Sequence, residues 1–114
     1  MNSENHLDRE VLQTLQEIMG DEFPVLITTF INDSDERIRS LQKALATQNS
    51  DALQRSAHSF KGSCHNLGAK YLATLCEHME HRGREGELEG LECHLVDIQQ
   101  EFSQIKSILR SFTG

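Results

Sequence analysis

The chain has 114 residues, a length that fits one domain with one hydrophobic core. Its single proline and seven glycines leave long uninterrupted segments, which favours helices over a β-sandwich or barrel with many turns. Its 18 acidic and 11 basic side chains give a net charge of −7, which argues against binding to nucleic acid or to anionic membranes.

Two helices are predicted in the first part of the chain. A short helix over residues 8–19 can be capped by Asp8 and ends at Gly20. A long amphipathic helix follows over residues 22–47, because apolar residues recur there at spacings of three and four. It carries Pro24 in its first turn, where the missing N–H of proline is harmless.

Three further helices are predicted after the turn "TQNSD". The third covers residues 51–66 and is followed by Gly68, which suits a helix C-cap. The fourth covers residues 69–82 and stops at "RGREG", and the fifth covers residues 87–112 with the strictest alternation of three and four. We expect residues 1–114 to form a single all-α domain, an antiparallel up-down-up-down four-helix bundle whose short extra N-terminal helix covers one end.

His58 is the candidate functional residue of the third helix. On a helical wheel the apolar stripe lies opposite His58, so the imidazole should project to solvent and can act as a nucleophile. Lys61 at i+3 shares this face and could attract an anion held at His58. Gly62 at i+4 costs the helix about 1 kcal/mol relative to alanine and leaves a gap beside the imidazole. The alternatives, an ordinary solvated histidine and a glycine at a close helix contact, remain open at this point.

The stretch "AHSFKGSCHNLGA", residues 57–69, resembles the signature of histidine-containing phosphotransfer (HPt) domains. In that family an Ala-His pair is followed by Lys-Gly at the same spacing and by a Leu-Gly-Ala exit. The resemblance covers most of the chain, because HPt domains are helical bundles of about this length. Phe60 stands where leucine is frequent in the family, and Cys64 where a small residue is frequent. The chain looks most like a stand-alone bacterial HPt protein.

The resemblance implies a role for each residue of the motif. His58 would be the phosphoacceptor, Lys61 would steady the phosphoryl group, and Gly62 would leave room for the partner. The phosphoryl group would come from the aspartyl phosphate of a receiver domain and pass on to a second receiver, in hybrid sensor histidine kinases and response regulators. Parts of the second helix should join the docking surface. Three further exposed residues are expected to contact the partner: Gln54, Arg55 and His65.

A phosphoryl carrier of this kind needs no cofactor of its own. No Gly-rich nucleotide loop occurs in the sequence, so we expect no ATP site and classify the chain as a phosphorelay intermediate rather than an enzyme. The resemblance implies that Mg²⁺ and the acidic pocket belong to the partner receiver. We expect a monomer. The alternative function is a helical adaptor or sequestering module that binds receiver or signalling proteins without phosphotransfer.

The cysteines and histidines outside the motif suggest no metal site. The spacing of the possible ligands matches no standard zinc pattern. That set comprises Cys76, His78, His81, Cys93 and His94. Cys64 and Cys76 are better explained as small core residues, and Cys93 as an exposed thiol.

The expected compartment follows from the cysteines and from the absence of two kinds of segment in the sequence. Three cysteines without short-range pairing indicate reduced thiols in a cytoplasm. The start "MNSENHLDRE" has no basic start followed by an apolar run, so no signal peptide is expected. No apolar stretch approaches the roughly 18 residues that would span a bilayer. We therefore expect a soluble, cytoplasmic protein.

Overall fold

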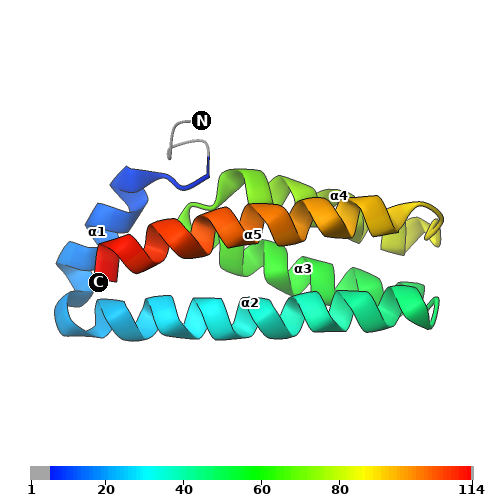
Figure 1. Cartoon of the computed structure of the whole chain (residues 1–114), viewed down its shortest axis with the longest axis horizontal. Coiled ribbons are helices and arrows are strands. Elements are labelled where there is room, and N and C mark those ends of the chain that lie inside the picture. Colours follow the sequence, from blue (N-terminus) through cyan, green and yellow to red (C-terminus); the bar gives the residue numbers. More distant parts are fainter. Residues whose placement is uncertain (1–5, 114) are drawn as a thin grey trace.

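The computed structural model describes residues 6–113, which lie mostly in helices that run side by side (Figure 1). Residues 1–5, the first half of the segment in which no signal peptide is expected, lie outside the described part. The elements in chain order are α1 (Arg9–Met19), the 3-10 turn η2 (Gly20–Glu22), α2 (Phe23–Ala46), α3 (Ser50–Leu67), α4 (Lys70–Glu85) and α5 (Leu91–Thr113). The predicted all-α bundle of four long helices is confirmed. Short connections make consecutive long helices antiparallel, and α1 lies at one end of the bundle (Figure 1).

The helix ends are fixed by the residues that the sequence predicts. Asp8 caps α1, since its carboxylate accepts hydrogen bonds from the backbone N–H groups of Glu10 and Val11. Pro24 lies in the first turn of α2. Gly68 ends α3 in the left-handed conformation, with a φ of 75° that residues other than glycine rarely adopt. Local capping residues therefore determine where these helices begin and end.

The connection between the last two helices differs from the prediction. The fourth helix continues to Glu85 rather than ending near residue 82, and the fifth begins at Leu91 rather than at residue 87. Gly83 of "RGREG" lies inside α4 and is buried, whereas Gly86 ends the helix. A Cβ atom at Gly83 would lie 2.9 Å from the backbone nitrogen of Gln54 in α3. Gly83 thus allows α3 and α4 to approach closely, so it has a packing role and does not end the helix.

The core holds the apolar stripe of α3 in place. The rings of Phe30 and Phe60 each meet Phe102 of α5 edge-on, with centroid distances of 6.4 and 6.5 Å. Burial of a phenylalanine side chain contributes about 1.5–3 kcal/mol, so Phe60 anchors α3 firmly. All five residues of the predicted stripe are buried: Leu53, Ala57, Phe60, Cys64 and Leu67. The opposite side of α3 is thereby turned to solvent.

The three cysteines lie where the sequence predicts. Cys64 and Cys76 are buried, and Cys93 is exposed. A hydrogen bond with Cys76 and burial both raise the pKa of the Cys64 thiol, which keeps this sulfur protonated and unreactive. Among residues 6–113, no helix combines the length and apolar character that crossing a membrane requires.

The segment before α1 is held against the bundle by polar contacts. The Nδ1 atom of His6 lies 2.7 Å from the carboxylate of Glu101 in α5, and both side chains are buried. The backbone N–H of Asp8 donates to the carbonyl oxygen of Gly68 at 2.9 Å. The Asp8 carboxylate pairs with Lys70 at 3.1 Å, and this contact holds the pKa of Asp8 below its usual range. These contacts connect the N-terminal segment to α3, α4 and α5.

Candidate functional site

His58 lies near the middle of α3, on the side that faces solvent. Its side chain is 69% exposed, whereas Ala57 and Phe60 beside it are buried. The predicted exposure of the imidazole is therefore confirmed. A rigid helix that is anchored by its opposite face presents this ring to any approaching molecule.

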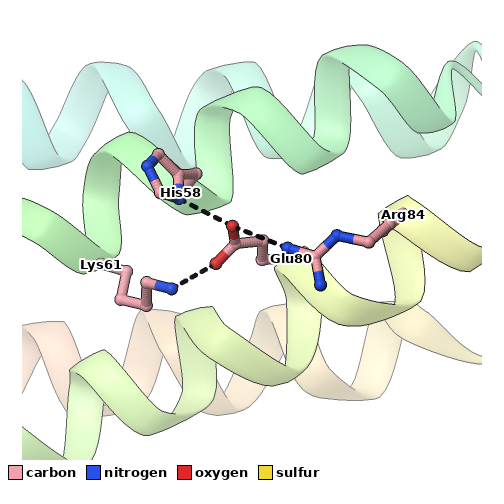
Figure 2. Close-up of polar contacts among 4 residues, drawn as sticks. All are labelled: His58, Lys61, Glu80 and Arg84. Atoms are coloured by element: carbon pink, nitrogen blue, oxygen red, sulfur yellow. Dashed lines mark hydrogen bonds and ion pairs between the residues drawn. The ribbon is translucent and has the colours of Figure 1, made fainter.

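A buried carboxylate from the next helix holds the imidazole. The Nδ1 atom of His58 lies 2.7 Å from Oε2 of Glu80 in α4, whose side chain is only 5% exposed (Figure 2). An ionised carboxylate can only accept, so Nδ1 carries the proton and donates it. In the neutral ring the lone pair then lies on Nε2, the nitrogen that points away from Glu80 (Figure 2). The contact selects the tautomer with a nucleophilic outer nitrogen.

Glu80 is the centre of a network that joins α3 and α4. Lys61 Nζ lies 2.6 Å from Oε1, and Arg84 Nη2 donates to Oε2 at 3.3 Å (Figure 2). Burial is the largest influence on the pKa of Glu80 and raises it, but the hydrogen bonds and charges of Lys61 and His58 together bring this pKa below its usual range. Glu80 is consequently ionised at neutral pH despite its burial.

Lys61 is less available than the wheel predicts. It lies on the face of His58, but only 23% of its side chain is exposed, because the ammonium group reaches back to Glu80. The ammonium group is thus paired with a buried carboxylate rather than freely solvated beside the imidazole. Any anion at His58 shares Lys61 with this carboxylate.

Gly62 lies next to open space. A Cβ atom built at this position would meet nothing within 4 Å. The bundle therefore does not need a glycine here for packing, and the close helix contact that was left open for Gly62 occurs instead at Gly83. The surface beside His58 is free of side chains at this point.

The other predicted residues are placed differently with respect to the imidazole. A hollow of about 380 Å³ is lined by Gln54, Arg55, His58, Glu80 and Arg84. Arg55 is exposed and pairs with Asp51 at 3.2 Å. The backbone of Gln54 lies close to Gly83 of α4. His65 is exposed farther along α3, outside this hollow.

Glu80 and Arg84 are the site residues that sequence reasoning missed. The buried stripe of α4 includes Cys76, Glu80 and Gly83, so a glutamate occupies a position where the helical period expects an apolar residue. A charged residue in an apolar stripe is a signal for a paired, functional carboxylate. That signal was present in the sequence.

The predicted absence of a metal site concerns residues on α4 and α5. Among residues 6–113, no three His, Cys, Asp or Glu side chains are placed to hold a metal ion together. Cys76 is buried within the core and Cys93 is exposed.

Comparisons with known proteins agree on one family. The family model of the Hpt domain matches residues 25–108. Histidine-containing phosphotransfer protein B (HptB) from Pseudomonas aeruginosa PAO1 is 43% identical, with a TM-score of 0.90 over 93% of this chain and 92% of that one. The HPT domain of a sensor hybrid histidine kinase from Shewanella has the same fold, with 16% identity and a TM-score of 0.77 over 96% and 94% of the two chains. The comparison with curated proteins gave no match.

Proposed function

Because the chain belongs to the Hpt domain family and has a histidine phosphotransfer role in phosphorelays, we propose that His58 is its phosphoacceptor and that Nε2 takes the phosphoryl group. One observation carries this proposal. His58 is largely exposed while Glu80 binds its Nδ1, so the outer nitrogen keeps its lone pair.

The proposed step is a displacement at phosphorus. The Nε2 lone pair attacks the phosphorus of an aspartyl phosphate, the bond from phosphorus to the aspartyl oxygen breaks, and the aspartate leaves as a carboxylate. No proton has to leave Nε2, because Nδ1 holds the ring proton. The positive charge that develops on the imidazole is stabilised by Glu80, and transfer to the next receiver reverses the step.

Lys61 and Gly62 would support this step in different ways. With its ammonium group 2.6 Å from Glu80, Lys61 keeps the carboxylate ionised and brings a cation near the phosphoryl group. Gly62 provides the space in which the phosphoryl group and the partner approach Nε2. Gln54, Arg55 and His65 are the proposed flanking contacts to the partner.

Hpt proteins are phosphoryl carriers that act with partners in phosphorelays. For this chain we propose receiver domains of hybrid sensor histidine kinases and response regulators as the partners. ATP and Mg²⁺ would be bound by those partners and not by this monomeric chain. The free cysteines support a cytoplasmic location, where thiols stay reduced.

Phosphotransfer from a labelled receiver tests the assignment. The wild-type protein should take up an acid-labile, alkali-stable phosphoryl label, and His58→Gln should abolish it. His65→Gln, a second histidine on the same helix, should still take up label, because a flanking contact changes the rate of transfer and not the acceptor. Label on the His58→Gln protein would show that another residue is the acceptor. Receiver binding by the wild type without any label would favour an adaptor instead.

A further inference from the structure

Lys61 would have two anions to serve once His58 carries a phosphoryl group. In the structure its Nζ atom lies 2.6 Å from Oε1 of Glu80, while the outer nitrogen of His58 points away from that carboxylate (Figure 2). A phosphoryl group on this nitrogen adds up to about two negative charges on the solvent side of the ring. To reach it, the ammonium group has to turn away from Glu80. Stabilising the phosphoryl group therefore takes a cation from the carboxylate.

Glu80 depends on cations to stay ionised. Its side chain is 5% exposed, and burial raises the pKa of this carboxyl. Lys61 and His58 are the main causes that bring the pKa below its usual range. A buried charge that loses its partner is costly, so the loss of Lys61 would weaken the carboxylate that holds Nδ1 of His58.

Arg84 is placed to supply the missing cation. It lies one turn after Glu80 on α4, and its Nη2 atom lies 3.3 Å from Oε2 (Figure 2). This contact is longer than the roughly 2.7–2.9 Å of a tight charge-assisted hydrogen bond, so it has room to shorten. The side chain is 53% exposed and can reorient without disturbing the core. Its guanidinium carries five N–H donors, enough to donate to Oε1 as well as to Oε2.

We propose that Arg84 is a positioning residue that takes the place of Lys61 on Glu80 when Lys61 turns to the phosphoryl group. The exchange keeps Glu80 charged and keeps Nδ1 of His58 bound throughout the step. It gives a reason for a second cation beside a carboxylate that Lys61 already neutralises. The inference rests on the proposed phosphotransfer to His58 and adds a residue that acts through Glu80.

Loading by phosphoramidate tests the exchange without a partner protein. Nε2 attacks the phosphorus, the P–N bond of phosphoramidate breaks, and ammonia leaves. We expect Arg84→Gln to lower the loading rate about fivefold. Arg84→Lys keeps the charge and should recover most of the rate. Arg39→Gln removes an arginine from α2, where it lines a hollow that contains no residue of α3 or α4, and should load like the wild type. The circular dichroism of all three variants should match the wild type.

Two backgrounds distinguish positioning from direct contact with the phosphoryl group. In a Glu80→Gln protein Arg84 has no carboxylate to hold, and in a Lys61→Ala protein no lysine leaves Glu80 during the step. Adding Arg84→Gln should therefore change the loading rate by less than about twofold in either background. A full effect of Arg84→Gln in either background, or none in the otherwise wild-type protein, would overturn the exchange.

Failure of the proposed function would look different. A wild-type protein that takes no label on His58 from phosphoramidate or from any phosphorylated receiver would overturn phosphotransfer and the exchange with it. Label on His58 that appears equally fast in the wild type and in the Arg84→Gln protein would overturn the exchange alone.

Discussion

Two histidine–glutamate pairs in this molecule have the same contact and different surroundings. In both, Nδ1 lies 2.7 Å from Oε2 of a glutamate whose side chain is 5% exposed. The His58 side chain of the α3–α4 pair is 69% exposed, whereas the His6 side chain that contacts Glu101 of α5 is 9% exposed. In the first pair the outer nitrogen meets solvent; in the second the imidazole is part of the packing.

The pKa values of the two carboxylates are shifted in opposite directions. Burial is the largest influence on both pKa values and raises them. At Glu80 the contacts of Lys61 and His58 outweigh burial and lower the pKa, but at Glu101 the contact of His6 does not, so that pKa stays raised. Solvent access to the ring and cations that keep the carboxylate charged thus distinguish the pair that we propose to react from the pair that only packs.

Neutralising each glutamate in turn should give the largest difference between the two pairs, measured as the rate of phosphotransfer. Glu80→Gln removes the charge that stabilises a positive imidazole, so we expect phosphotransfer to His58 to slow by about tenfold or more. Glu101→Gln should leave the transfer rate unchanged, because this pair lies apart from the proposed chemistry. Single-turnover transfer from a phosphorylated receiver measures both. Equal rates for the two variants would remove the functional distinction between the pairs.

The two glycines near His58 test how helix spacing supports the first pair. Gly83→Ala places a Cβ atom 2.9 Å from the backbone of Gln54, so we expect a loss of about 1–3 kcal/mol in the free energy of unfolding and slower transfer. Gly62→Ala meets no neighbour and should raise that free energy by about 0.5–1 kcal/mol. Urea unfolding measures both changes. Destabilisation by Gly62→Ala would show that the gap beside His58 has a packing role.

This contrast also explains how much the sequence could predict. The exposure of His58 and the caps at Asp8 and Gly68 depend on residues within a few positions, so helical periodicity and capping rules find them. The hydrogen bond between Glu80 and His58 depends on how α3 and α4 are placed against each other. The close approach of α3 at Gly83 helps to fix that placement. No pattern within one helix contains that placement.

The predicted end of the fourth helix was wrong for a related reason. The sequence predicts that the fourth helix stops at "RGREG", whose two glycines have the same local propensity. Gly83 continues α4 because its missing side chain admits Gln54, while Gly86 ends the helix in the left-handed conformation with a φ of 72°. Tertiary contact distinguishes two residues that propensity treats alike.

The smallest expected effect is a pH dependence of stability with opposite signs at the two carboxylates. The pKa of Glu80 is lowered by Lys61 and His58 against burial, so its stabilisation is present above the unfolded pKa of about 4.3 and is lost as pH falls through the folded pKa. Burial raises the pKa of Glu101 despite His6, so stability falls as pH rises from about 4.3 through that raised pKa.

Urea midpoints measured from about pH 3 to about pH 7 would show both trends. Glu80→Gln should reduce the loss of stability on the acid side, because glutamine has no charge to lose. Glu101→Gln should instead reduce the decline above about pH 4.3, because it removes a carboxyl that must ionise while buried. A change of the same sign in both variants would mean that the two carboxylates have similar electrostatic surroundings, and the difference between a reactive and a packed pair would then rest on solvent access to the imidazole alone.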